Sequence, residues 1–198
     1  MKNKIYIAGC GGMLGDAFYK QFNKKYELKC SDIDVNEDWL SYLDFRDFKD
    51  YKNYVTDFKP DWLFHVGAYT DLEYCELHQE DTYATNTDSV KHAVYIANEL
   101  SIPLLYISTA GIFDGKDDVY DESSTPNPNG HYAKSKYQGE KYVIENANDY
   151  LICRAGWMMG GGPKKDKKFI LMVTYTKHFL NVVINIFIRI FFVKNVHA

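Results

Sequence analysis

The chain has 198 residues, of which 46% are hydrophobic and 25% are charged, and this balance excludes a wholly disordered protein. Its formal net charge is −4, from 23 basic and 27 acidic residues, so it lacks the overall basic character of nucleic-acid-binding proteins. A chain of this length is typical of one domain with room for part of a second.

Cysteine usage points to a reducing compartment. The four cysteines, Cys10, Cys30, Cys75 and Cys153, form no CxxC pair and are too few for a disulfide framework in a chain of this length. We therefore expect reduced thiols in a cytoplasmic protein. The apolar run near the N-terminus is too short for the core of a signal peptide, and glycines interrupt it.

Strands and helices alternate along the sequence up to about residue 155. A β-rich run at 4–8 ends at glycines, and apolar residues four apart then predict a helix over 13–23. The later predictions are a strand at 27–31, a helix at 48–58 with Asp47 as its N-cap, a strand at 62–66, a helix at 90–100, a strand at 104–107, a polar loop at 121–130, a helix at 132–148 and a strand at 150–153. This alternation is typical of an α/β fold with a doubly wound parallel sheet.

The C-terminal part of the sequence has a different character. Three glycines and a proline at 160–163 precede a basic stretch at 164–168, and 169–193 is strongly apolar. Because Arg189 and two asparagines interrupt the longest apolar piece, a buried helix or strand is favoured over a membrane span. We therefore expect one domain at 1–162 and an atypical apolar tail at 163–198, with the composition of a truncated or frame-shifted end.

A glycine-rich turn follows the first strand, where Gly9, Gly12 and Gly15 have the spacing GxxGxxG. Glycines there allow a tight turn and let the backbone approach a pyrophosphate at a helix N-terminus. Asp32 follows Gly9 by 23 residues, at the end of the second strand. Its carboxylate can accept hydrogen bonds from the ribose hydroxyls of a dinucleotide and would repel a 2′-phosphate. The alternative interpretation of Asp32 is an acidic residue of a surface turn.

Tyr132 and Lys136 form a YxxxK pair at the start of a predicted helix. This spacing places phenol and ammonium on one helical face, where the cation would lower the pKa of the phenol and allow proton exchange with a carbonyl or alcohol. Tyr137 and Lys141 repeat the spacing, but Tyr132 directly follows the polar loop and is expected to face the strand ends. Thr109 ends an earlier strand, so its hydroxyl is expected near the same substrate oxygen.

Two patterns that resemble metal sites fail in detail. Residues 32–36 open like an EF-hand loop, but Glu37 and Leu43 occupy the positions where that loop needs Gly and Glu. Cys75 and His78 have no second pair of the zinc type. We therefore expect no metal site.

The glycine turn, the strand-end threonine and the YxxxK pair, in this order, resemble the extended short-chain dehydrogenase/reductases. Other segments are similar to the dTDP-4-dehydrorhamnose reductase family within that group: LDFRD at 43–47, PDW at 60–62, GAYT at 67–70, ATN at 84–86, ST at 108–109, FDG at 113–115, YDE at 120–122, PNP at 126–128, YAKSKYQGE at 132–140 and RAGW at 154–157. The resemblance covers about residues 3–162 and implies an NAD(P)-binding Rossmann-like domain at 1–162, with most of the substrate lobe missing.

The resemblance implies an oxidoreductase that reduces a nucleotide-linked 4-keto-6-deoxy sugar with hydride from NADPH or NADH, as in dTDP-L-rhamnose synthesis. Tyr132, assisted by Lys136 and Thr109, would protonate the C4 oxygen. Residues expected at the cofactor are Gly9, Gly12, Met13, Leu14, Gly15, Asp32, Asp44, Phe45, Ala68, Tyr69, Thr70, Tyr132 and Lys136, and those expected at the sugar nucleotide are Thr109, Ala110 and Trp157.

The sequence also departs from the family pattern. Ala110 and Gly111 stand where the family usually has Asp-Tyr, which leaves the exact sugar open, and His131 directly precedes the tyrosine. Two other functions are left open: a sugar-nucleotide epimerase or dehydratase, and a non-catalytic nucleotide-binding regulatory subunit. We expect a sugar nucleotide as the partner, with neither nucleic acid nor membrane, and we leave a homodimer open.

Overall fold

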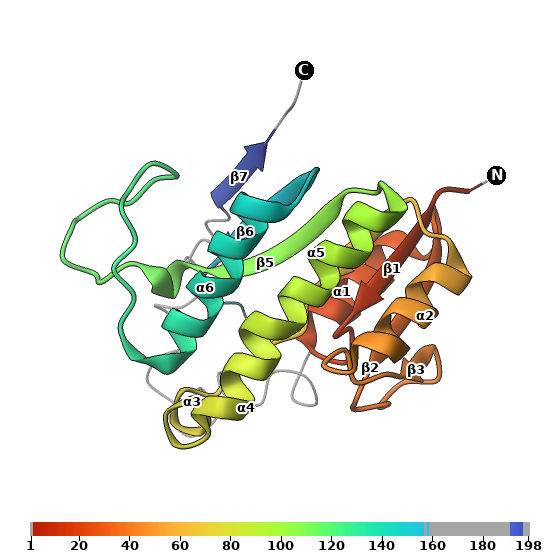
Figure 1. Cartoon of the computed structure of the whole chain (residues 1–198), viewed down its shortest axis with the longest axis horizontal. Helices are drawn as coiled ribbons and strands as arrows, with labels where there is room; N and C mark the ends of the chain where they lie inside the picture. Colours follow the sequence, from red (N-terminus) through yellow and green to blue (C-terminus); the bar gives the residue numbers. More distant parts are fainter. Residues whose placement is uncertain (1, 157, 159–190, 196–198) are drawn as a thin grey trace, which may run out of the picture.

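The computed structural model describes residues 2–156, 158 and 191–195, and within these ranges it contains one sheet of seven strands (Figure 1). The strands are β1 (Lys4–Ala8), β2 (Glu27–Asp32), β3 (Leu40–Tyr42), β4 (Trp62–His65), β5 (Leu104–Thr109), β6 (Tyr150–Ala155) and β7 (Phe191–Asn195). Their order is β3-β2-β1-β4-β5-β6-β7. The first six strands are parallel, and β7 pairs antiparallel with β6.

This topology confirms the doubly wound parallel sheet predicted from the sequence. The chain builds the sheet outward from β1 in both directions, first through β2 and β3 and then through β4, β5 and β6. The order therefore reverses between β1 and β4. In open α/β sheets, ligands bind beyond the carboxyl ends of the strands at such a switch point, so this edge of the sheet is where a site is expected.

The helices are α1 (Met13–Phe22), α2 (Phe48–Phe58), α3 (Leu72–Leu77), α4 (Gln79–Tyr83), α5 (Ser89–Leu100) and α6 (Gly130–Asn146), with a π-helical turn η1 (Ala84–Asp88) and a 3₁₀ turn η2 (Ala110–Ile112). Every predicted strand and helix up to residue 155 is present, with ends shifted by no more than two residues. The α2 helix begins at the predicted cap, because the Asp47 side chain accepts a hydrogen bond from the Asp50 N–H at 3.0 Å.

Two apolar layers sandwich the sheet. Alternate residues of β1 point to opposite faces, so Tyr6 and Ala8 join one buried cluster and Ile5 and Ile7 join the other. The first cluster packs under α2, α5 and α6, which lie side by side in front of the sheet in Figure 1. The second cluster packs under α1, whose Phe18 ring lies 5.6 Å from that of Phe64.

Only part of the predicted apolar tail can be compared with the structure. Residues 191–193 belong to β7, so a strand is present in this part of the predicted apolar tail. The rest of the tail and the predicted domain boundary at 162 lie outside the described residues, so that boundary stays a prediction. Within the described residues, the structure has no helix with the length and hydropathy that a membrane crossing requires.

A buried ion pair joins α6 to β6. The Glu140 side chain is fully buried and that of Arg154 is 5% exposed. Arg154 Nη2 donates to Glu140 Oε1 at 2.7 Å, and Nε donates to the same oxygen at 3.1 Å. The guanidinium also lies 5.5 Å from the ring centre of Phe113 and donates to the carbonyl of Glu122. This pair therefore connects the helix that carries the YxxxK motif to both β6 and the loop after β5.

A second buried polar group lies at the end of β4. The ring of His65 sits between two hydroxyls, with Nδ1 3.1 Å from Tyr51 Oη and Nε2 3.1 Å from Ser89 Oγ. Burial lowers the pKa of His65 to about 3, and the positive charge of Lys136 contributes in the same direction. The imidazole is therefore neutral in the folded protein throughout the neutral and mildly acidic range.

We expect His65 to make the protein less stable as the pH falls from about 6.5 towards 3. An unfolded His65 takes up a proton below its ordinary pKa of 6.5, whereas the folded one does so only near 3, so its stabilising contribution is complete above 6.5. Between pH 7 and pH 5 this linkage amounts to about 2 kcal/mol of unfolding free energy. Urea unfolding at both pH values measures it. His65→Asn should reduce the slope and His78→Asn, at an exposed histidine, should not; equal slopes in both variants would contradict the assignment.

Candidate functional site

The glycine turn after β1 has the backbone geometry that only glycine allows. Gly9 has φ of +78°, and a Cβ there would collide with the backbone of Gly67. A Cβ on Gly15 would collide with the backbone of Cys10, so this glycine lets α1 pack closely against the turn. Gly12 is the N-cap of α1, and open space lies where its Cβ would be.

The N-terminus of α1 therefore fits a pyrophosphate. The first N–H groups of a helix have no intrahelical partner, which leaves those of Met13 and Leu14 directed outward from the turn. The helix dipole favours negative charge at this end. Gly12, Met13 and Leu14, which are predicted at the cofactor, lie here beside the switch point of the sheet.

Asp32, at the end of β2, contacts the glycine turn directly. Its Oδ2 accepts a hydrogen bond from the Gly11 N–H at 2.8 Å, and its Oδ1 accepts one from the Asp34 N–H at 2.9 Å. Asn36 donates to the carbonyl of Gly11 at 3.2 Å. The loop after β2 is thus tied to the glycine turn, and the half-buried carboxylate of Asp32 lies where a dinucleotide ribose would be recognised.

Asp44 and Phe45 follow β3 and lie on the same edge of the sheet. Arg46 Nη2 contacts Asp44 Oδ2 at 2.6 Å, and this guanidinium lowers the pKa of Asp44. Arg46 also pairs with Asp81 of α4, at 2.5 Å. The buried Phe45 ring lies so close to Gly67 that a Cβ there would be forced against it. The structure therefore brings the predicted adenine-side residues next to the segment after β4.

Asn86 holds that segment in place. Its Oδ1 accepts a hydrogen bond from the Tyr69 N–H at 2.8 Å, and its Nδ2 donates to the Tyr69 carbonyl at 3.0 Å and to Ser135 Oγ at 3.1 Å. Ala68, Tyr69 and Thr70 are in this way tied to α6. The Asn86 side chain is fully buried in the π-helical turn η1, a type of turn that is frequent at functional sites.

Asn86 is a site residue that sequence reasoning missed. The segment ATN was part of the family resemblance, but Asn86 itself had no predicted role. The available signal was a small amide side chain between Thr85 and Thr87, just before an apolar helical stripe. Such residues compete with the helix backbone for hydrogen bonds, so they favour irregular turns over regular helix.

Tyr132 and Thr109 meet at the carboxyl end of β5. Tyr132 is half-buried, and this burial raises the pKa of its phenol, whereas the neighbouring Thr109 side chain lowers it by a smaller amount. Thr109 Oγ1 in turn accepts a hydrogen bond from the Gly111 N–H at 3.0 Å. The two hydroxyls are therefore adjacent, as the sequence predicted, and the phenol is held in its neutral form.

Lys136 lies one helical turn further along α6 in a buried position. Its Nζ is 4.4 Å from the ring centre of Tyr106, and burial lowers its pKa to about 7, while the charge of Glu140 acts in the opposite direction. The prediction that Lys136 lowers the pKa of Tyr132 is wrong for this structure, because the pKa of the phenol is raised. The physical reason is desolvation, which disfavours the charged form of both groups.

The remaining predicted substrate residues are only partly described. Ala110 directly follows Thr109 and begins η2. Trp157 lies outside the described residues. Among the described residues, the structure contains no group of three or more His, Cys, Asp or Glu side chains arranged to hold a metal ion.

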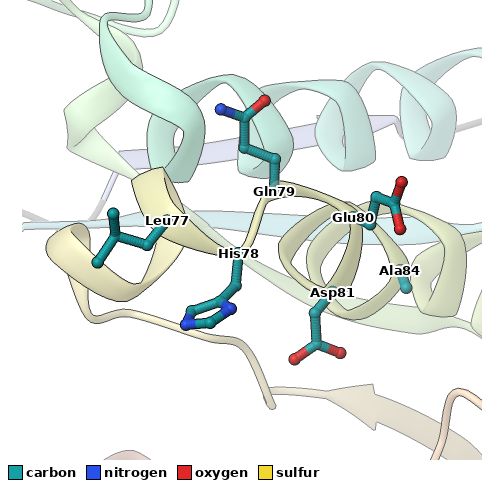
Figure 2. A pocket seen from close by; sticks show the side chains of 6 residues that line it. All are labelled: Leu77, His78, Gln79, Glu80, Asp81 and Ala84. Carbon is teal, nitrogen blue, oxygen red and sulfur yellow. The ribbon is translucent and has the colours of Figure 1, made fainter.

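A pocket opens beside the adenine-side residues. Its lining comes from α3, α4 and η1 and the residue between the two helices, and consists of Leu77, His78, Gln79, Glu80, Asp81 and Ala84 (Figure 2). His78 and Asp81 point to the same side of the segment in Figure 2, and Gln79 points to the other. Asp81 connects this pocket to the predicted site, because it also pairs with Arg46, the partner of Asp44.

Comparison with known proteins identifies the family of the chain. A family model described as the RmlD substrate binding domain matches residues 2–187. A dTDP-4-dehydrorhamnose reductase from Aggregatibacter actinomycetemcomitans is 28% identical over 183 residues, which are 91% of this chain and 60% of that protein. A methionine adenosyltransferase 2 subunit beta from Xenopus tropicalis is 28% identical over 180 residues, which are 90% of this chain and 54% of that protein.

Solved structures agree with this relationship. The dTDP-4-dehydrorhamnose reductase of Yersinia enterocolitica is 32% identical with a TM-score of 0.76, over 88% of this chain and 59% of that one. The Bacillus anthracis reductase, solved in complex with NADP, is 29% identical with a TM-score of 0.74, over 81% of this chain and 55% of that one. The chain spans between 54% and 60% of the length of these four relatives. The fold, the order of the site segments and the family match together confirm the resemblance: the chain belongs to the RmlD substrate binding domain family.

Proposed function

We propose that the chain reduces a nucleotide-linked 4-keto-6-deoxy sugar, as a dTDP-4-dehydrorhamnose reductase does, with NADPH or NADH as its cofactor. The pairing of the Tyr132 phenol with the Thr109 side chain, at the carboxyl end of β5, carries this proposal. It supplies two hydroxyls for one carbonyl oxygen on the same edge of the sheet as the glycine turn. The reductases among the relatives support the reaction class.

The residues of the chain have separate roles in this reaction. The N–H groups at the start of α1 bind the pyrophosphate, and Asp32 accepts hydrogen bonds from the ribose. A bound NADPH or NADH supplies the hydride that the sugar carbonyl carbon receives. Tyr132 donates its phenolic proton to the carbonyl oxygen, which Thr109 also contacts, and the product is an alcohol.

The raised pKa of Tyr132 suits this direction of reaction. A neutral phenol is the form that can donate a proton, and burial keeps Tyr132 neutral. Lys136, with a pKa of about 7, exchanges protons readily at neutral pH from one helical turn away. It can therefore return a proton to the phenol after each turnover.

A second candidate function is supported by one group of relatives. The chain is 28% identical over 180 residues to a protein named as a subunit of methionine adenosyltransferase. This favours a nucleotide-binding regulatory subunit without turnover as the alternative. The hypothesis of an epimerase or dehydratase rests only on the shared YxxxK pair.

A cofactor-consumption assay distinguishes these functions. The purified chain is mixed with NADPH or NADH and a dTDP-linked 4-keto-6-deoxy sugar, and loss of the reduced cofactor is followed by absorbance. We expect stoichiometric loss of NAD(P)H with formation of the alcohol. Cofactor binding by calorimetry without consumption would favour the regulatory subunit, and a changed sugar without net consumption would favour an epimerase or dehydratase.

We expect NADH to bind about ten times more tightly than NADPH, a difference of about 1.4 kcal/mol. The carboxylate of Asp32 would repel a 2′-phosphate, and residues 30–45 contain five acidic residues and neither Lys nor Arg. Asp32→Asn keeps an oxygen for the Gly11 N–H, so it should mainly reduce the preference, whereas Asp38→Asn, at an exposed neighbour, should not. Calorimetric titration with both cofactors measures this, and tighter binding of NADPH to the unaltered chain would contradict it.

A further inference from the structure

We propose that Glu76 of α3 is a positioning residue for Tyr132, and this inference rests on the proposed reductase function. Glu76 and His131, in the first turn of α6, are 55 residues apart in the sequence. Its Oε1 accepts a hydrogen bond from the backbone N–H of His131 at 2.6 Å. His131 directly precedes Tyr132, so the carboxylate holds the backbone from which the phenol projects.

Gly130 leaves room for the carboxylate of Glu76 beside the backbone of α6. Its φ is +74°, and a Cβ there would lie 2.8 Å from Glu76 Oε1. A larger residue at this point would therefore combine a strained backbone with a collision against the carboxylate. The sequence thus supplies a glycine at the place where α3 reaches the first turn of α6.

Glu76 takes the place of a local helix cap. In the described structure, the side chain of Asn129, the N-cap residue of α6, makes no capping hydrogen bond. The first N–H groups of a helix need an acceptor, and negative charge is favourable beside them. A carboxylate from another helix therefore satisfies the first turn of α6 and fixes its position relative to α3.

The side chain of His131 strengthens the same connection. Its Nε2 lies 4.0 Å from Glu76 Oε2, and its Nδ1 lies 3.4 Å from Tyr83 Oη at the end of α4. The rings of Tyr83 and His131 meet edge to face, with centres 5.9 Å apart. Residues of α3 and α4 therefore hold His131 from two sides, and Cys75, next to Glu76, is close enough to Tyr132 to raise its pKa further.

Fixing His131 matters because proton transfer depends on alignment. A misplacement of about 1 Å in a reacting group can cost about 100-fold in rate. Tyr132 must stay beside Thr109, which belongs to β5 and not to α3 or α6. The contact between Glu76 and His131 fixes the position of the first turn of α6. Tyr132 projects from this turn towards β5.

The test compares three variants of the full chain. Glu76→Ala removes the acceptor, and we expect kcat to fall about 10- to 100-fold while the KM for the cofactor changes less than about twofold. Glu76→Gln keeps an oxygen at the same place, so kcat should return to within about threefold of the unaltered chain. Glu73→Ala, at an exposed carboxylate of the same helix, is the matched control and should have no effect.

A second measurement does not depend on turnover. Amide hydrogen exchange of a peptide spanning residues 128–138 should be faster in Glu76→Ala and unchanged in Glu76→Gln and Glu73→Ala. Unchanged exchange in Glu76→Ala, or unchanged kcat in an active enzyme, would overturn the positioning role. If the unaltered chain consumes no cofactor while exchange still increases in Glu76→Ala, the proposed function fails and the contact between α3 and α6 stands.

Discussion

Replacing Tyr132 with phenylalanine is expected to lower kcat about 10²- to 10⁴-fold, while cofactor binding stays within about twofold. The variant removes only the phenolic oxygen, which is the proposed proton donor and the partner of Thr109. The aromatic ring remains to fill the same buried space. Single-turnover kinetics with NADH and a dTDP-linked keto sugar measure the chemical step, and calorimetry measures the affinity for NADH.

Tyr137→Phe is the matched control for this experiment. Tyr137 and Lys141 repeat the YxxxK spacing on the same helix, and Lys141 Nζ lies 5.2 Å from the ring centre of Tyr137. Because this pair lies beyond the first turn of α6, its phenol should not affect turnover. Equal losses in both variants, or full turnover in Tyr132→Phe, would remove Tyr132 from the proposed mechanism.

Replacing Arg154 with methionine is expected to lower the free energy of unfolding by about 3–5 kcal/mol. The variant leaves the carboxylate of Glu140 fully buried without its bidentate partner, and an uncompensated buried charge is strongly unfavourable. It also removes the hydrogen bond to the carbonyl of Glu122 and the contact with Phe113. Urea unfolding followed by circular dichroism measures the change.

The double variant Glu140→Gln with Arg154→Met distinguishes the cost of an unpaired buried charge from the cost of lost side-chain packing. It removes both charges together, so it should be more stable than Arg154→Met alone by about 2 kcal/mol or more. Lys52→Met is the surface control, because its ion pair with Glu99 at 2.8 Å is partly exposed and should contribute little to stability. A loss below about 1 kcal/mol for Arg154→Met would show that the buried pair is not important for stability.

Five of the six parallel strands, all except β3, and every helix of ten residues or more could be predicted from the sequence. These elements have periodic apolar residues over two or more turns, or continuous apolar runs, and clear boundaries such as Asp47. The sequence also placed the glycine turn, Asp32, Thr109 and Tyr132 at one edge of the sheet, because the carboxyl ends of parallel strands share an edge.

Short elements escaped prediction for the opposite reason. Strand β3 has three residues, and α3 and α4 have six and five, so none is long enough to show a period. Their positions depend on contacts with distant segments. The hydrogen bonds of Asn86 to Tyr69 and Ser135, which join residues 17 and 49 positions apart, are of the same kind.

The protonation of Tyr132 and Lys136 depends on how the folded elements pack. Spacing alone placed Lys136 beside Tyr132 and suggested a lowered pKa for the phenol. Packing of α6 against β5 buries Lys136 and part of Tyr132, which makes desolvation the larger effect. The contact of Glu76 with His131 likewise appears only after folding brings α3 to α6. Local periodicity specifies elements, whereas burial and long-range hydrogen bonds depend on which elements become neighbours.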